Sequence, residues 1–248
     1  MKLNLSSEDF SKRQITILNL LFEREYQQKD LQEALETSAP NLHYHLNKLE
    51  ELNLIRKKTL YEVGNVKINS VSLNPAARQQ IRKIIGKEVK TYTLITGFGL
   101  YETGYRVPDL VFRILNRYHY PISRVVCFTT EDAQEKRFQF QDEEILMAIN
   151  EFYLFPYPEY RYIESELFQS LEVKISKEME EANIIIDLTP LSKLFSFKLL
   201  ELANKYQIPC VYLGMGKDEE NKLYWMSNMK IEGEIEPFDW PWGNLIIK

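Results

Sequence analysis

The sequence has little cysteine and no long apolar run. Its two cysteines, Cys127 and Cys210, have neither the CxxC nor the histidine-paired spacing that a zinc site or a disulfide framework requires. The first ten residues, MKLNLSSEDF, lack the apolar core of a signal peptide, and no apolar stretch approaches the length of a membrane span. We therefore expect a cytoplasmic protein without a metal site, in which both cysteines are buried core residues.

Common nucleotide-binding and nucleophile motifs are also missing. The chain has no Walker A lysine motif. The stretch GFGLYE has Gly97 and Gly99 in the dinucleotide spacing, but Glu102 occupies the third glycine position, where a carboxylate would repel a pyrophosphate. No Ser-His-Asp arrangement emerges, because His119 is the only histidine beyond residue 45. These motifs therefore assign no cofactor and no catalytic residue.

The net charge of −5 hides an uneven distribution along the chain. Of the 31 basic and 36 acidic residues, 15 basic and 11 acidic ones lie in residues 1–90, which leaves 16 and 25 for residues 91–248. The first part is therefore mildly basic and the second part is acidic. A contact with a polyanion is expected in the first part.

Three helices are predicted in the basic part. Residues 11–26 carry an apolar stripe at helical spacing, residues 28–37 form a shorter helix, and residues 39–55 carry a second stripe. Ser38 is a good N-cap for the last helix, and Pro40 belongs in its first turn. A short helix, a tight turn and a longer helix make a helix-turn-helix.

The outward surface of the last helix is polar, and its first two turns contain no acid. Such side chains can donate to base edges or phosphates. Three basic residues and two β-prone runs around Gly64-Asn65 follow, which indicates a hairpin with a basic base. The predicted DNA contacts are Ser38, Pro40, Asn41, His43, Tyr44, Asn47, Lys48, Arg56, Lys57 and Lys58. His43 and His45 point to different helix faces, so they are not expected to share a metal ion.

With TSAPNLHYHLNKLEELNLI at the position of the recognition helix, residues 1–74 resemble the winged helix-turn-helix domains of ArsR- and MarR-type prokaryotic regulators. The resemblance implies binding to duplex DNA, as a dimer on a palindromic site. Winged helices also serve as protein-interaction modules, and this alternative stays open. Residues 75–90 should form a linker helix that joins two domains, pairs with its copy, or packs back on the winged domain.

Residues 91–248 alternate apolar strands with helices. The alternation predicts an α/β domain, a Rossmann-like and mostly parallel sheet that is covered on both faces. Ligands bind such sheets beyond the carboxyl ends of the strands, where the strand order switches. The expected strands are 91–99, 123–132, 160–166, a short one that begins at residue 183 and breaks at Asp187, and 208–215. The expected helices are 107–118, 142–155, 170–182 and one that begins at residue 190, and residues 222–235 should form a terminal hairpin or edge pair.

Three polar corners lie at expected strand ends. They are Thr96-Gly97-Phe98-Gly99, Thr129-Thr130 and Thr189-Pro190-Leu191-Ser192-Lys193. In the third corner, Thr189 can cap a helix whose first position is Pro190. Alternatively, this corner holds an anion through the free N–H groups of the helix, two hydroxyls and the Lys193 ammonium. The convergence of three corners favours the anion site.

The segment DLTPLSK, between a strand and an amphipathic helix, and the glycine corner TGFG after the first strand resemble the ligand-binding motifs of CARF domains, the CRISPR-associated Rossmann-like domains. The resemblance implies a homodimer that forms one symmetric pocket for a cyclic oligoadenylate, commonly the four-adenylate ring. The implied ligand contacts are Thr96, Gly97, Phe98, Gly99, Thr189, Ser192 and Lys193.

The leading hypothesis is a dimeric DNA-binding transcription regulator that responds to such a ring in CRISPR-linked antiviral defence. A first alternative is a ring nuclease, in which Lys193 and Ser192 would assist attack of a ribose 2′-hydroxyl on the adjacent phosphate. A second alternative is a metabolite-sensing regulator with an unrelated ligand.

Overall fold

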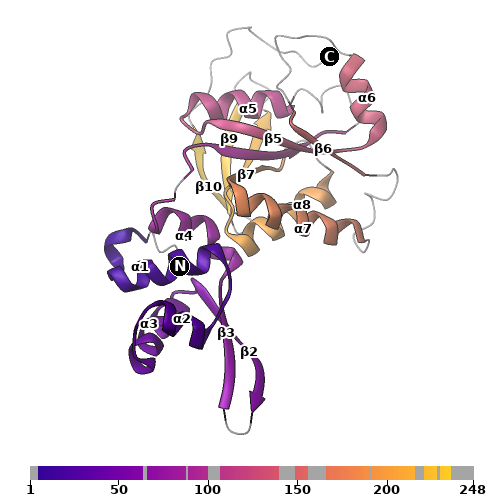
Figure 1. Ribbon diagram of the computed structural model, residues 1–248. Helices are drawn as coiled ribbons and strands as arrows, with labels where there is room; N and C mark the ends of the chain where they lie inside the picture. The colour runs from indigo at the N-terminus through magenta and orange to yellow at the C-terminus, as the bar shows by residue number, and fades with distance from the viewer. Residues whose placement is uncertain are drawn as a thin grey trace. The chain divides into compact units, whose positions relative to one another are not determined.

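The computed structural model describes residues 5–63, 66–87, 89–99, 107–139, 149–155, 166–189, 192–215, 221–227 and 230–235. The chain divides into two compact units, Met1–Val89 (unit 1) and Lys90–Lys248 (unit 2), each of which is described by itself (Figure 1).

Unit 1 is a group of helices with a three-stranded antiparallel sheet, whose long hairpin extends from the helices (Figure 1). The strand order is β1-β3-β2. Its elements are η1 (Ser7–Asp9), α1 (Lys12–Glu23), β1 (Tyr26–Gln27), α2 (Gln28–Ala34), α3 (Ala39–Glu51), β2 (Ile55–Val63), β3 (Val66–Leu73), η2 (Pro75–Ala77) and α4 (Arg78–Ile84). The expected helix-turn-helix is formed by α2 and α3, and the expected hairpin by β2 and β3.

The helices of unit 1 begin where local hydrogen bonding favours them. A capping box precedes α1, since Gln14 N donates to the Ser11 hydroxyl and Ser11 N donates to Gln14 Oε1. Helix α3 begins after Ser38, whose side chain makes no capping bond, and Pro40 lies in its first turn.

One apolar core holds unit 1 together. Ile17 of α1, Leu31 of α2, Leu46 of α3 and Ile81 of α4 are fully buried within it, and each contributes roughly 1.5 to 3 kcal/mol of burial free energy. Helix α4, expected as a linker, therefore packs back on the winged domain. It ends before Gly86, whose φ of 70° is the left-handed conformation that favours glycine after a helix.

Unit 2 is a seven-stranded sheet in the order β10-β9-β8-β7-β4-β5-β6. The five strands from β8 to β6 run parallel to one another, and β9 runs antiparallel to both of its neighbours, β8 and β10. Its elements are β4 (Tyr92–Gly97), α5 (Val107–Arg117), β5 (Ile122–Thr129), α6 (Glu131–Gln139), β6 (Glu151–Leu154), α7 (Glu166–Glu181), β7 (Asn183–Asp187), α8 (Lys193–Tyr206), β8 (Cys210–Met215), β9 (Asn221–Ser227) and β10 (Lys230–Ile235). The expected fold class is confirmed: a helix-turn-helix unit is followed by a mostly parallel α/β sheet.

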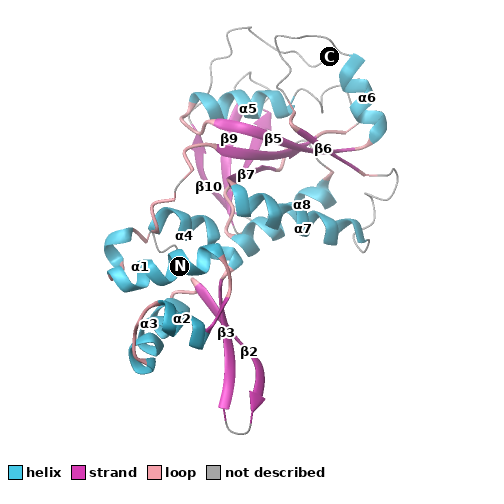
Figure 2. Cartoon of the chain, in the orientation of Figure 1, coloured by secondary structure: helices cyan, strands magenta, loops and turns pink. Residues whose placement is uncertain are grey.

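Helices cover both faces of this sheet (Figure 2). Helices α7 and α8 pack on the face that includes Ile95 of β4 and Ile186 of β7, and α5 packs on the face that includes Leu94 and Ile185. Successive residues of each strand thus face opposite cores, which explains why the strand sequences are continuously apolar. Both cysteines are buried in strands as expected, and burial raises the pKa of the Cys127 thiol.

Two sequence-based assignments in unit 2 were wrong. Residues 151–154, expected within a helix, form the edge strand β6, which pairs with β5. Residues 131–139 form α6, although no helix was predicted there and residues 131 and 132 were expected at the end of a strand. Of the strand expected at residues 160–166, residues 160–165 lie outside the described part of the chain, and Glu166 begins α7.

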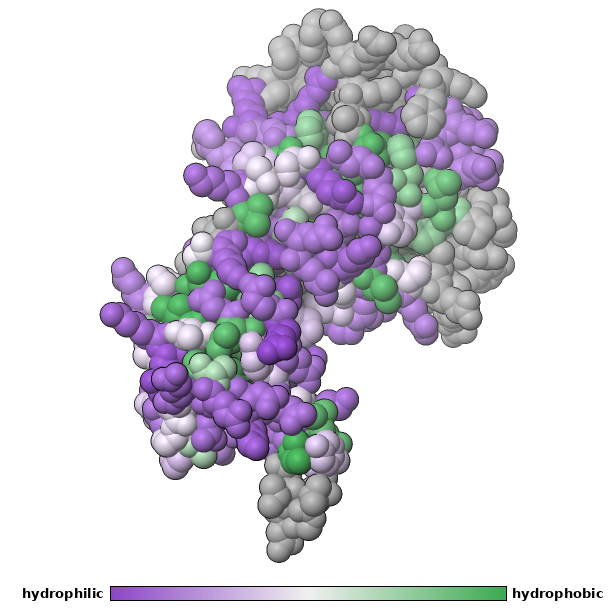
Figure 3. Space-filling model, in the orientation of Figure 1, coloured by the Kyte–Doolittle hydropathy of each residue, from purple (hydrophilic) through white to green (hydrophobic). Residues whose placement is uncertain are grey.

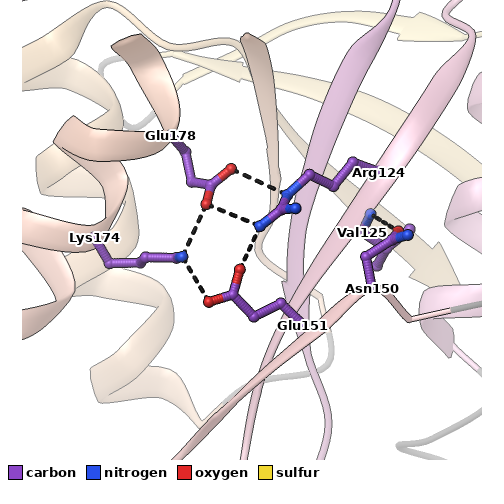
Figure 4. A network of polar contacts seen from close by, with 6 residues as sticks. All are labelled: Arg124, Val125, Asn150, Glu151, Lys174 and Glu178. Carbon is purple, nitrogen blue, oxygen red and sulfur yellow. Dashed lines mark hydrogen bonds and ion pairs between the residues drawn. The ribbon is translucent and has the colours of Figure 1, made fainter. Parts of the chain in front are cut away.

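A cluster of four charged residues ties α7 to β5 and β6 (Figure 4). Lys174 Nζ lies 2.8 Å from Glu151 Oε1 and 2.9 Å from Glu178 Oε1, and Arg124 forms ion pairs with both carboxylates. Burial disfavours the Lys174 charge, but hydrogen bonds to Glu151, Tyr153 and Glu178 outweigh it and raise the pKa of Lys174. Arg124 and Glu151 lie near the amino ends of their strands. The cluster therefore stabilises the packing of α7 at the end of the sheet opposite the polar corners.

No helix in the described part of the chain is long and apolar enough to cross a membrane. The face in view in Figure 3 is mostly hydrophilic, with small separate apolar areas.

Candidate functional site

The predicted recognition residues lie on the outer surface of α3 or at its start. Ser38, Pro40, Asn41, His43, Tyr44 and Lys48 are exposed and Asn47 is partly exposed. The opposite face buries Leu42, Leu46 and Leu49. The first turn contains no acid, and the acids of the helix, Glu50 and Glu51, lie at its end. This surface can therefore approach a polyanion without local repulsion from its first turns.

Contacts within unit 1 orient several of these side chains. Asn41 Nδ2 donates to the Thr37 hydroxyl at 3.0 Å, and Arg13 of α1 donates to the same oxygen. The Lys48 ammonium lies 4.8 Å from the centre of the Tyr44 ring, which is a cation–π contact. Tyr44 remains 54% exposed, so its ring is presented to solvent together with the Lys48 charge.

The three basic residues of β2 do not share one environment. Arg56 and Lys58 are exposed, whereas the Lys57 side chain is only 19% exposed. Lys57 Nζ lies 2.7 Å from Glu50 Oε2 and 2.6 Å from Asn47 Oδ1, both on α3. Alternation along the strand thus directs two cations to solvent and one toward the recognition helix. The predicted hairpin tip, Gly64-Asn65, lies outside the described residues.

His45 differs from His43, as expected from their spacing. His43 is exposed, whereas His45 is partly buried and its Nδ1 atom has no hydrogen-bond partner within the described residues. Burial, followed by the charges of Arg13 and Lys48, lowers the pKa of His45.

The sheet of unit 2 brings the three polar corners together at the carboxyl ends of its parallel strands. They follow β4, β5 and β7, which are neighbouring parallel strands in the order β7-β4-β5. The chain continues from β4 to β5 on one side and later returns to β7 on the other, so the switch in strand order lies between β4 and β7. Ligands bind at such a switch in open α/β sheets.

A buried carboxylate that the sequence analysis missed links two of these corners. Asp187, at the end of β7, accepts a hydrogen bond from Thr96 Oγ1 at 2.8 Å and from Thr189 N at 2.9 Å. It is fully buried. Desolvation raises the pKa of Asp187 to about 6, although both threonines favour the charged form. An aspartate at the end of the apolar run NIIID was the available signal.

The residues of the first two corners are mainly buried. Thr96, Gly97, Phe98 and Thr129 are buried, and Thr129 Oγ1 donates to the Phe98 carbonyl oxygen at 2.8 Å. Gly99 and Thr130 are partly exposed, and the Thr130 hydroxyl accepts from Ala133 N at the start of α6. The threonine side chains of the second corner thus hydrogen-bond to backbone groups at the carboxyl ends of the strands. The predicted role of both corners in ligand binding stays a prediction.

Beneath the first corner lies a buried ion pair. Arg137 of α6 donates to both carboxylate oxygens of Asp109 of α5, at 3.0 and 3.2 Å, and its guanidinium lies 5.3 Å from the centre of the Phe98 ring. Both charged side chains are almost fully buried. The pair holds α5, α6 and the Phe98 corner together.

The third corner is the most exposed. Ser192 and Lys193 are exposed, and Thr189 is partly exposed. The expected cap was wrong: α8 begins at Lys193 with Ser192 as its N-cap, and Phe195 N donates to Ser192 Oγ at 3.3 Å. The Thr189 hydroxyl instead accepts from Leu213 N of β8 at 2.7 Å. Pro190 and Leu191 lie outside the described residues.

Comparison with known proteins agrees with the reading of unit 1. Residues 11–57 match the model of the bacterial regulatory proteins of the arsR family, and they span α1, α2, α3 and the start of β2. The amino-terminal unit is thus a winged helix-turn-helix of the kind found in these regulators. No curated protein matches the chain.

Several solved structures are distantly similar. Lactococcus lactis ZitR, a zinc-responsive MarR family member, is 21% identical, with 33% of this chain and 54% of ZitR covered and a TM-score of 0.28. Enterococcus italicus Csm6, bound to cyclic hexa-2′-fluoro-hexa-dAMP, is 15% identical, with 52% and 35% covered and a TM-score of 0.40. Can2 from Sulfobacillus thermosulfidooxidans, in complex with cyclic tetra-adenylate, is 18% identical, with 57% and 36% covered and a TM-score of 0.36. The chain spans about half the length of ZitR and about a third of the other two, and these similarities assign no ligand to it.

Proposed function

We propose that the protein is a homodimeric transcription regulator that binds a palindromic duplex site through unit 1 and senses a cyclic oligoadenylate through unit 2. The match of residues 11–57 to regulatory proteins of the arsR family carries the first part of the proposal. The acid-free start of α3 and the exposed Arg56 and Lys58 support it, because phosphate contacts from basic side chains provide most of the affinity for DNA.

The second part rests on the resemblance of the DLTPLSK and TGFG segments to CARF motifs. Its structural support is the Thr96–Asp187–Thr189 link, which holds the glycine corner and the Lys193 corner on adjacent strands at the switch point. Lys193 is the exposed first residue of α8, whose first-turn N–H groups have no carbonyl partner within the helix, although the Ser192 hydroxyl already accepts from Phe195 N. An ammonium beside these donors suits a phosphodiester, and a two-fold axis would supply the arrangement twice.

Two measurements on the full chain test this function. Thermal unfolding with cyclic oligoadenylates of four and six units, linear oligoadenylate and ATP should show stabilisation by one ring alone, since a bound ligand stabilises the folded state by mass action. Mobility shifts on the gene's own promoter should show a complex that weakens with salt. Absence of both effects would refute the proposal.

Product analysis separates the alternatives. Conversion of the ring to linear oligoadenylate during incubation would favour a ring nuclease, and loss of that conversion in Lys193→Ala would assign the reaction to this corner. Stabilisation by an unrelated metabolite instead of a ring would favour a metabolite-sensing regulator.

A further inference from the structure

The outer surface of α3 carries a chain of polar contacts, in which each group determines which atom of the next group donates or accepts a hydrogen bond. Lys57 Nζ lies 2.7 Å from Glu50 Oε2 and 2.6 Å from Asn47 Oδ1. Asn47 Nδ2 in turn lies 2.9 Å from His43 Nδ1. The contacts begin on the hairpin strand β2 and end on the exposed ring of His43, two helical positions from the predicted DNA contact Asn41.

Donor and acceptor rules fix the state of every member. An ammonium group can only donate, so the Asn47 atom beside Lys57 must be the carbonyl oxygen, and the amide nitrogen must face His43. An amide nitrogen also only donates, so His43 Nδ1 must be the unprotonated acceptor. The neutral imidazole then carries its proton on Nε2. Within the described residues, Nε2 has no partner.

The contacts of Lys57 fix its ammonium group beside Asn47, so that it can impose this orientation on the Asn47 amide. Lys57 forms an ion pair with Glu50, and most of its side chain is buried between β2 and α3, unlike the exposed Arg56 and Lys58 on either side of it. Its ammonium group is thus engaged with α3 in the free protein. The charge of Lys57 orients Asn47, and Asn47 selects the tautomer of His43.

We propose that His43 is a base-reading residue that offers a fixed Nε2–H donor to guanine, and that Asn47 and Lys57 are its positioning residues. This inference rests on the proposed DNA binding of unit 1. In the major groove, guanine presents two neighbouring acceptors, N7 and O6, whereas cytosine presents an amino donor. A side chain that can only donate at this position therefore discriminates between the two bases of a G·C pair.

The test begins with selection of high-affinity duplexes from a random pool by the full-length protein. At one guanine of each half-site, replacement by 7-deazaguanine should weaken wild-type binding by about fivefold, the value of one hydrogen bond. The same replacement should have no effect in His43→Ala. An equal effect of 7-deazaguanine in wild type and His43→Ala at every guanine would overturn base reading by His43, as would a uniform loss of affinity across all sequences, which would assign His43 to phosphate.

Lys57→Met and Arg56→Met form a matched pair of variants. Lys57→Met should reduce the preference for that guanine and leave the salt dependence of binding unchanged, because Lys57 acts through Asn47. Arg56→Met should lower the slope of log affinity against log salt by about one and keep the preference. A lower salt slope with an intact preference in Lys57→Met would make Lys57 a phosphate contact and overturn its positioning role.

Imidazole ¹⁵N spectra of the free protein test the hydrogen-bond chain without DNA. Wild-type His43, assigned by comparison with His43→Ala, should be in the Nε2–H form, and Lys57→Met should give a mixture of tautomers. The same mixture in wild type would overturn the chain of contacts even if the protein binds DNA. Failure to select any duplex would overturn both base reading and the proposed function, whatever the spectra show.

Discussion

Asp187→Asn should remove a pH-dependent loss of stability from unit 2. The Asp187 carboxyl group is fully buried, and desolvation raises its pKa to about 6 from an ordinary value of 3.8. That difference corresponds to about 3 kcal/mol. Asparagine can keep both contacts, since its oxygen can accept from Thr189 N and its amide nitrogen can donate to Thr96 Oγ1.

The sign follows from which state holds the proton more tightly. The folded protein does so, because its pKa for Asp187 lies above the unfolded value. The stability that the protonated Asp187 carboxyl group contributes, relative to its charged form, is therefore complete below pH 3.8. It is lost as the pH rises through about 6. At about pH 8 the wild type retains the full cost of a buried charge, whereas the neutral asparagine avoids it. Asp187→Asn should thus be close to wild type near pH 4 and more stable by up to about 3 kcal/mol near pH 8.

Urea unfolding followed by tryptophan fluorescence suits this measurement. The sequence has no tryptophan before residue 90, and Trp225 lies in β9 of the sheet that contains Asp187, so the signal reports unit 2. Asp132→Asn is the matched control, because Asp132 is an exposed acid in the first turn of α6. Its profile of unfolding free energy against pH should parallel that of the wild type. Parallel profiles for wild type and Asp187→Asn would refute the argument, since they would mean that Asp187 has the same pKa in both states.

Four further outcomes are expected. Lys193→Ala should lower the affinity for the ring at least about tenfold by calorimetry, because it removes a charge-assisted contact worth roughly 1.5 to 3 kcal/mol, and unchanged affinity would remove Lys193 from the site. Lys174→Ala should lower the unfolding free energy of unit 2, measured by urea unfolding, by about 3 kcal/mol, because Arg124 must then balance the charges of both Glu151 and Glu178. Replacement of the exposed Lys177 on the same helix by Ala should change this free energy by under about 0.5 kcal/mol. Alanine at both Arg56 and Lys58 should lower the salt slope of DNA binding by about two, and an unchanged slope would place DNA elsewhere. If the two units are coupled, operator DNA must change ring affinity by the same factor by which the ring changes DNA affinity, and equal ring affinities with and without DNA would exclude coupling.

Much of the fold follows from sequence periodicity, and the failures have physical causes. Strand β7 was predicted from its short apolar run, and it extends one residue further than predicted, because Asp187, which was expected at the break after the strand, is its last residue. Helix α6 has no apolar stripe: its buried positions include Ala133 and Arg137, and the burial of Arg137 depends on an ion pair with Asp109 of α5. No local pattern reveals such a helix. The four-residue strand β6 is too short for its period to be distinguished from that of the preceding apolar run.

The start of α8 shows the same dependence on distant contacts. Thr189 and Ser192 are both residue types that cap helices, so sequence could not decide between them. The decision comes from β8, because Leu213 N donates to the Thr189 hydroxyl and occupies it. Ser192 is left to cap the helix, and Lys193 becomes its first residue. The anion hypothesis for this corner therefore keeps the ammonium of Lys193 but assigns the Thr189 hydroxyl a structural bond.

The basic segment of β2 shows what the sequence could and could not predict about the DNA-contacting surface. Strand alternation alone separates Lys57 from Arg56 and Lys58. Which side faces α3 is set by the pairing of β2 with β3 and by the packing of β2 against α3. The ion pair with Glu50 then neutralises Lys57 in the free protein. A charge count from sequence assigns three cations to this strand, whereas only Arg56 and Lys58 are exposed to contribute counterion release, and the salt dependence of the full chain should reflect that smaller number.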